Sequence, residues 1–220
     1  NTPFDLNLLE RAESVRPRVA YRLINAQSNR ELLKTLPHIP VLDLAKVFFL
    51  DLGADERGAM TVRITSAHLA HWGMDLETLS RLADENTPRL FPARILSIGE
   101  ALGELMRSGR REAGPPLYIL SNQNGISGAA CMLYTDILKD FADRMKANLV
   151  VLPSSIHEVL LLPDRGDQNY EELCLTVASI NRSEVDPEER LSNNVYLFSR
   201  STGRLRIAPV VTGPLQACSD

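Results

Sequence analysis

The stretch NLVVLPSSIHEVLLLPD, residues 148–164, contains two apolar runs that flank a short polar centre. The runs, 148–153 and 157–162, have the length of strands rather than helices and are rich in Val and Leu, which favours buried β-strands. The polar centre, PSSIHE, predicts a tight crossing held at a fixed place between two buried elements. The stretch therefore predicts strand, polar crossing, strand.

Several further segments are predicted as strands, most of them paired in hairpins. Residues 18–25 alternate apolar and polar side chains, which is the period of a half-buried strand. Asn124-Gly125 is a strong hairpin signal, so the segment after it is expected to return as a strand. The strands predicted outside 148–164 are 18–25, 41–52, 59–64, 91–98, 117–120, 126–133, 194–199 and 204–207.

Helices are predicted where apolar residues recur at helical spacing behind a capping residue. Ser66 is a candidate N-cap with Gly73 as the stop, and Asp75 caps a second helix that Asn86-Thr87-Pro88 ends. Further helices are predicted at 29–36, 99–108 and 170–180 and after Thr135. Because the strands cluster and form few strand-helix-strand repeats, we predict an α+β fold: a largely antiparallel sheet with helices packed on it, in a single compact domain.

Length and composition agree with one globular domain. The chain has 220 residues, of which 44% are hydrophobic and 24% charged, so it can bury a substantial core. We expect an N-terminal arm or helix at 1–17, the α+β domain at 18–208, and a tail at 209–220 that frays. Gly114-Pro115-Pro116 is the clearest linker signal inside the chain, but it is only three residues long.

Charge and cysteine usage argue against several classes of protein. The net charge is −4 and no basic tract is dense enough to predict a nucleic-acid-binding face. No apolar run is long enough to span a membrane, and the first ten residues lack the features of a secretory signal. The three cysteines are far apart, which predicts neither a disulfide framework nor a zinc site. We therefore expect a cytoplasmic protein that needs no cofactor.

The polar centre supplies the strongest cluster of chemically capable side chains. In our first interpretation, Ser154 and Ser155 satisfy backbone groups of a turn and His157 makes a structural hydrogen bond. The alternatives are a ligand-binding surface and a catalytic site, in which His157 is a general base, a serine the nucleophile and Glu158 the orienting group. No Gly-x-Ser-x-Gly motif surrounds the serines, and His157 and Glu158 would face opposite sides if both lay in a strand.

Two other groups of residues are candidate metal ligands. His68 and His71 lie three apart beside Trp72, but no third ligand is close in sequence. Asp43, Asp51 and Asp55 supply carboxylates without the spacing of a calcium loop. We predict no metal site for either group.

The chain resembles an uncharacterised domain-of-unknown-function family found in gut Clostridia and related Firmicutes. The likeness covers most of the chain between residues 21 and 203, and three motifs carry much of it: NTPRLFP at 86–92, NGISGAACMLY at 124–134 and LPSSIHEV at 152–159. The resemblance implies a bacterial cytoplasmic protein. Because it brings no established activity, it transfers no functional residue.

Taken together, these observations predict a non-catalytic binding or interaction module, with a hydrolase-like enzyme built on residues 154–158 as the alternative. The expected partner is a protein, not a nucleic acid or a membrane. The candidate functional surface consists of Ser154, Ser155, His157, Glu158, Asn86, Arg89 and Asn124.

Overall fold

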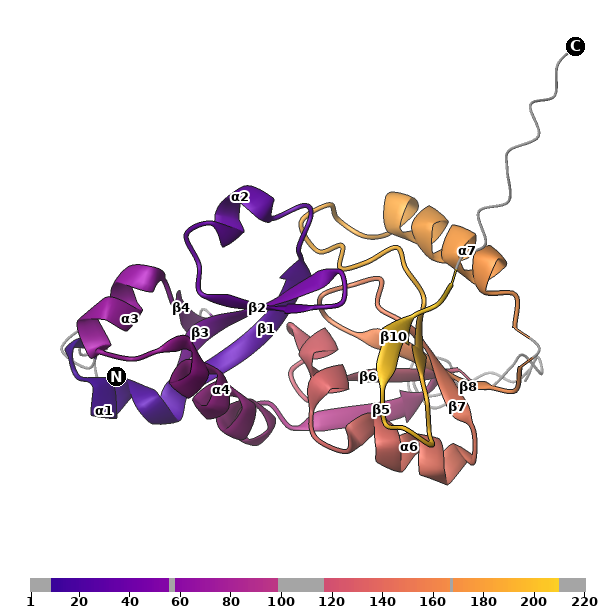
Figure 1. The fold of residues 1–220 in the computed structure, drawn as a ribbon, viewed down its shortest axis with the longest axis horizontal. Coiled ribbons are helices and arrows are strands. Elements are labelled where there is room, and N and C mark those ends of the chain that lie inside the picture. Colours follow the sequence, from indigo (N-terminus) through magenta and orange to yellow (C-terminus); the bar gives the residue numbers. More distant parts are fainter. Residues whose placement is uncertain (1–8, 56–57, 99–116, 167, 210–220) are drawn as a thin grey trace, which may run out of the picture.

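The computed structural model describes residues 9–55, 58–98, 117–166 and 168–209, and these residues build two neighbouring β-sheets (Figure 1). Each strand pairing in both sheets is antiparallel. Helices pack on the sheets, so the predicted α+β class and the antiparallel arrangement are confirmed. The predicted helix 99–108 and the linker 114–116 lie outside the described residues.

The first sheet has four strands and is organised around its longest member. Its strands are β1 (Val19–Asn25), β2 (His38–Val41), β3 (Leu44–Asp55) and β4 (Gly58–Arg63). Strand β3 pairs with all three others. The predicted strand at 41–52 is thus wrong at its start: the chain turns at Leu42, whose φ is 55°, and β3 begins only after the turn. Because residues 41–52 are mostly apolar, sequence reasoning did not detect this hairpin.

The second sheet has six strands in the order β10-β9-β7-β8-β6-β5. Its two central strands are β7 (Asn148–Leu152) and β8 (Val159–Asp164), as the opening stretch of sequence predicts. The others are β5 (Ala93–Ser97), β6 (Tyr118–Asn122), β9 (Tyr196–Phe198) and β10 (Leu205–Ile207), so the predicted C-terminal hairpin is also confirmed. The polar centre of the opening stretch forms the crossing from β7 to β8, and His157 lies in this crossing, before β8 begins.

Four longer helices accompany the sheets: α3 (Ser66–Trp72), α4 (Leu76–Leu90), α6 (Ile137–Met145) and α7 (Tyr170–Ser183). Two short helices, α1 (Ala12–Val15) and α2 (Arg30–Leu33), and two 3-10 helices, η2 (Arg16–Arg18) and η3 (Gly128–Leu133), complete the described set. Helix α4 does not end at Asn86-Thr87-Pro88: it includes Pro88 in its last turn. Helix α6 begins after Asp136, later than the expected cap.

The segment after the Asn124-Gly125 turn is not the predicted returning strand. It enters the 3-10 helix η3, which is buried along most of its length. The cause is close packing at Gly128, where a Cβ atom would lie 2.5 Å from the His157 carbonyl oxygen and 2.7 Å from the Asn122 nitrogen. The small residues of this segment therefore allow its backbone to pack closely against β6 and the β7–β8 crossing.

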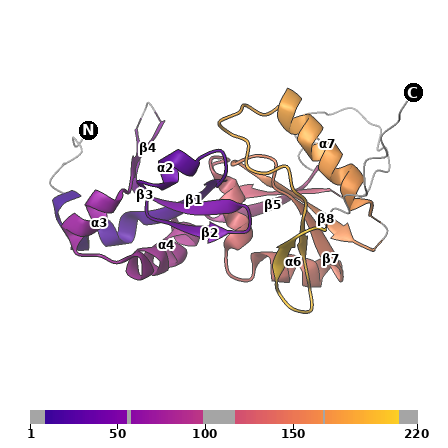
Figure 2. The ribbon, with the colours of Figure 1, turned by 45° about the horizontal axis from the view of Figure 1, so that its top comes forward.

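The six-stranded sheet is covered on both faces. Figures 1 and 2 show α6 on one side of it and α7 on the other. Strand β7 alternates accordingly: Leu149 and Val151 join the core that contains α6, whereas Val150 and Leu152 pack in the cluster under α7. The larger core is continuous across both sheets and includes Tyr21, Leu23, Phe48, Leu50, Leu79, Leu120, Phe141, Leu161 and Tyr196. The two sheets are thus joined by shared apolar packing.

No helix among the described residues is both long enough and apolar enough to cross a membrane.

Candidate functional site

The β7–β8 crossing is fixed by a second segment of chain that runs beside it. The Ser154 carbonyl oxygen accepts from the Leu191 nitrogen at 3.0 Å, and the Ile156 nitrogen donates to the Glu189 carbonyl oxygen at 2.9 Å. Ser155 is buried and forms an isolated antiparallel bridge with Arg190. The crossing therefore behaves as a short extra strand, with its backbone groups satisfied by residues 189–192.

The imidazole of His157 has partners at both nitrogens. Nδ1 accepts from the backbone N–H of Ser127 at 3.1 Å, which leaves Nε2 as the ring nitrogen that can donate. Nε2 lies 3.2 Å from Oε1 of Glu189. Sequence reasoning missed Glu189, because nothing local connects it to His157.

Within the described chain, neither Ser154 nor Ser155 forms the Ser–His hydrogen bond that the hydrolase alternative requires. The Ser155 hydroxyl oxygen accepts from the backbone nitrogen of His157 at 3.0 Å and does not contact the ring nitrogens by any hydrogen bond within the described chain. Glu158, the expected orienting group, instead lines a separate cavity of about 230 Å³ beside Arg94 and Asn124. The cluster thus has the local hydrogen bonds of a structural turn.

Asn86 and Arg89, from the NTPRLFP motif, hold down the segment that leads into β1. The Asn86 side-chain nitrogen donates to the carbonyl oxygens of Arg16 at 2.8 Å and Val19 at 3.0 Å. Arg89 donates to the Pro17 carbonyl oxygen at 2.8 Å. Both side chains therefore anchor backbone, and within the described chain neither forms a hydrogen bond with the β7–β8 crossing.

The turn after β6 is organised by Asn122, a buried residue that begins the polar turn cluster 122–125. Its side-chain oxygen accepts from the nitrogens of Asn124 and Ile126 at 3.1 and 3.3 Å, and its side-chain nitrogen donates to the Ile126 carbonyl oxygen at 2.8 Å. An Asn at the start of a turn cluster is the available sequence signal for such a role. The three bonds fix the loop 122–126 as a rigid arch.

Ser127 continues this arch in a left-handed conformation, with φ of 54°. A residue with a side chain adopts this conformation at a cost, and it persists where surrounding contacts enforce it. Here the enforcing contact is the bond from the Ser127 nitrogen to His157. The polar crossing is therefore the support on which the loop 122–127 rests.

The supported loop forms one wall of a cleft of about 240 Å³ between the two sheets. Tyr21 and Arg22 of β1, Phe49 and Asp51 of β3, and Ala59 and Thr61 of β4 form the opposite wall. Thr87 and Phe91, at the end of α4, lie between the walls, and Ala130 and Tyr134 extend the loop wall. Of the seven predicted surface residues, only Asn124 lines this cleft.

The inner surface of the cleft is aromatic and electrically neutral. The Tyr21 hydroxyl donates to the Ala130 carbonyl oxygen at 3.2 Å, and the Tyr134 hydroxyl donates to that of Phe91 at 2.8 Å. Burial raises the pKa of both phenols above its ordinary value. At neutral pH these tyrosines are thus protonated donors already in use, unsuited to acid–base work.

Polar groups gather at the mouth of the cleft. The Arg22 guanidinium lies 4.4 Å from the centre of the Phe49 ring, and Asp51 lies on the neighbouring strand of the same wall. Across the opening stands Ile126, an exposed large apolar side chain with 56% of its surface accessible. The cleft can therefore take an apolar group inside and polar groups at its rim.

Two of the candidate metal ligands, His68 and Asp43, have structural partners. His68 closes the start of α3 by accepting from the Thr65 nitrogen at 3.0 Å and stacks on Trp72. Asp43, at the β2–β3 turn, accepts from the Ser192 hydroxyl at 2.6 Å, from the Asn194 side chain at 2.9 Å, and from the Tyr196 hydroxyl. Within the described residues no group of three His, Cys, Asp or Glu side chains could hold a metal.

Comparison with known proteins bears on the family and leaves the activity open. No curated protein and no solved structure gives a significant match. Residues 1–200, which include the three motifs quoted above, match the model of a family of unknown function, DUF5688. The chain therefore belongs to the DUF5688 family.

Proposed function

We propose that this protein is a non-catalytic binding module whose recognition site is the cleft between the two sheets. The observation that carries the proposal is the cleft's construction: an aromatic interior, a charged rim and the exposed Ile126 on a loop held in a strained conformation. Exposed apolar side chains beside a preformed concave site are typical of recognition surfaces. Catalysis is not needed to explain any of these features.

The size of the cleft limits what it takes. A volume of about 240 Å³ is room for about eight waters, or a similar number of non-hydrogen atoms. That is smaller than the usual site for a drug-sized ligand and suits one aromatic or branched aliphatic side chain. We therefore propose that the ligand is a segment of a partner protein that inserts one apolar side chain, with its backbone near Arg22 and Asp51.

We propose the bacterial cytoplasm as the setting for this interaction. Cys131 and Cys174 are free thiols, and Cys131 is buried in the core, which is compatible with a reducing compartment.

The experiment is a titration of the isotope-labelled protein with N-acetyl-phenylalaninamide, followed by NMR. This probe carries one aromatic side chain between peptide groups, and N-acetyl-alaninamide is the matched probe without the ring. We expect saturable, millimolar binding of the aromatic probe alone, with the shifted signals in residues 122–127 and at the β1–β3 wall.

A pair of variants locates the binding. Ala59 is an exposed residue that lines the cleft, so Ala59→Trp fills the opening, whereas Ala70→Trp puts the same side chain on an exposed face of α3. We expect Ala59→Trp to abolish binding and Ala70→Trp to leave it unchanged. Equal binding of the two probes, or full binding by Ala59→Trp, would refute the proposed site.

A further inference from the structure

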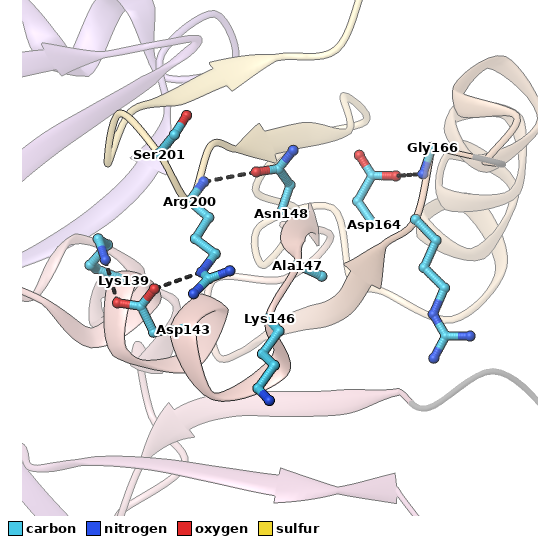
Figure 3. Close-up of a pocket in the computed structure, with 10 residues that line it drawn as sticks. Lys139, Asp143, Lys146, Ala147, Asn148, Asp164, Gly166, Arg200 and Ser201 are labelled. Atoms are coloured by element: carbon cyan, nitrogen blue, oxygen red, sulfur yellow. Dashed lines mark hydrogen bonds and ion pairs between the residues drawn. The ribbon is translucent and has the colours of Figure 1, made fainter.

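A second concave surface, which shares no residue with the cleft, lies at one end of the six-stranded sheet (Figure 3). It is an open groove of about 800 Å³ formed where α6 ends, β7 begins, β8 ends and the chain turns from β9 to β10. Its charged lining residues are Lys139, Lys146, Arg165, Arg200, Asp143 and Asp164. We call it the basic groove.

The basic groove is positive in a chain that is negative overall. Four cations and two carboxylates give it a net charge of +2, against −4 for the whole sequence. Its positive charge is therefore a local feature and not a reflection of composition.

Both carboxylates in the groove are already engaged. Asp143 accepts hydrogen bonds from Lys139 and, at 2.7 Å, from Nε of Arg200. These two hydrogen bonds hold the pKa of Asp143 below its usual range. Asp164 accepts from the Gly166 nitrogen at 2.9 Å and from the Tyr170 hydroxyl at 2.7 Å.

Two of the four cations, and the terminal nitrogens of a third, remain available to bind a ligand. Within the described part of the chain, Lys146 and Arg165 form no ion pair, and both side chains are exposed. Arg200 uses Nε for Asp143, and its terminal nitrogens make no hydrogen bond to a described residue. Figure 3 shows Arg200 fixed by Asp143 and by the bond from its own backbone nitrogen to Asn148, with Lys146 extending from the end of α6 nearby.

The backbone conformation and position of Lys146 bear on why a lysine stands there. Lys146 follows the last turn of α6 with φ of 55°, a position where glycine is favoured because it has no Cβ. A cation near a helix C-terminus is stabilising by itself, so the helix dipole can account for the charge of Lys146. It does not account for Arg165 and Arg200, which come from the end of β8 and the turn after β9.

We propose that the basic groove binds a compact, non-aromatic anion that carries two phosphate groups. Guanidinium and ammonium groups together are the usual protein ligands of phosphate oxygens, and three separate cations match more than one charge. No aromatic side chain lines the groove, so stacking on a nucleobase, which single-stranded nucleic acids require, has no platform among the described residues.

The test is calorimetric titration of the full chain with inorganic pyrophosphate at low ionic strength, with inorganic phosphate and a single-stranded oligonucleotide as comparisons. We expect saturable binding of pyrophosphate, weaker binding of phosphate, and loss of affinity as salt is added, because exposed charges are screened. An absence of saturable pyrophosphate binding, or tighter binding of the oligonucleotide, would overturn the proposal.

Two variants identify the groove as the site without threatening the fold. Lys146→Gly removes a charge and relieves the left-handed strain, and Arg165→Gln alters an exposed side chain; each should weaken pyrophosphate binding about threefold and the pair about tenfold. Arg30→Gln, on α2, is the matched control and should bind as the unmodified protein does. Unchanged affinity in the double variant would equally overturn the proposal.

Discussion

Gly128 stands where three groups from other segments leave no room for a side chain. The Ser121 hydroxyl, the His157 carbonyl and the Asn122 nitrogen all approach the position that a Cβ would take. We expect Gly128→Ala to lower the free energy of unfolding by about 2 kcal/mol or more, because overpacked cores shift backbone or adopt poor rotamers. Equilibrium urea unfolding measures this loss.

Gly125, three residues earlier, is the matched control. It has φ of 67° and open space around it, so Gly125→Ala introduces backbone strain without a collision. We expect a loss of about 1 kcal/mol. A loss at Gly128 equal to or below that at Gly125 would contradict the close packing described here.

Two thiols of the chain should differ in reactivity. Burial raises the pKa of Cys131 to about 11, whereas Cys174 is partly exposed. The thiolate is the reactive form, so at about pH 8 iodoacetamide should modify Cys174 at least about ten times faster than Cys131 in the folded protein. Peptide mass spectrometry gives both rates, and the difference should vanish in denaturant. Equal rates in the folded state would mean that η3 opens readily.

At the scale of elements, the β2–β3 turn is tied to the C-terminal strands by Asp43. Removal of this carboxylate leaves the buried Tyr196 hydroxyl without its acceptor, so we expect Asp43→Ala to cost about 3 kcal/mol. Asp140→Ala, on the exposed face of α6, should cost less than about 1 kcal/mol. Urea unfolding compares the two variants.

A double-mutant cycle isolates the bond itself. Tyr196→Phe should lower the free energy of unfolding in the unmodified protein but have little effect once Asp43 is Ala, because the shared hydrogen bond is then already absent. Additive effects of the two substitutions would show that Asp43 and Tyr196 do not interact.

The elements that sequence predicts well are those whose signal is local. Strands β7 and β8 are apolar on both faces, since α6 and α7 cover the sheet from opposite sides, and a continuous Val-Leu run between polar residues suffices to identify them. The 3-10 helix η3 was missed because its conformation depends on Ser121 and His157, which come from other parts of the chain.

The candidate site was less accessible to sequence reasoning for the same physical cause. Tyr21, Phe49 and Tyr134 meet at the cleft only after two sheets pack together, and no spacing in the sequence records this. The cluster at 154–158 was visible because its polar residues are adjacent. The structure gives His157 a supporting role beneath the loop that lines the cleft, with Glu189 as a partner that no local pattern indicates.

At the scale of the whole molecule, the buried tyrosine phenols limit the stability of the fold at high pH. Burial raises the pKa of Tyr21, Tyr134 and Tyr196 above its ordinary value, and the nearby Asp43 carboxylate adds to the shift at Tyr196. A raised folded-state pKa stabilises the protein below the unfolded-state pKa of about 10, and this stabilisation is lost as the pH rises further.

We therefore expect the free energy of unfolding to fall above about pH 10, by about 1.4 kcal/mol per pH unit for each of these tyrosines. Urea unfolding over a series of alkaline buffers measures the slope. Tyr21→Phe should reduce the slope by the contribution of one phenol, and an unchanged slope in that variant would contradict the assignment.

The Asp43 contacts also impose an order on events during synthesis. The partners of this carboxylate lie 149 to 153 residues further along the chain. At ribosomal speeds of about 5–20 residues per second, the turn emerges on the order of ten seconds before the strands that it will hold. Throughout that interval the carboxylate is hydrated and the six-stranded sheet lacks β9 and β10. Strands β9 and β10 therefore complete the contacts of Asp43, and a ribosome that stalls before residue 196 leaves a nascent chain without the Tyr196 partner of this carboxylate.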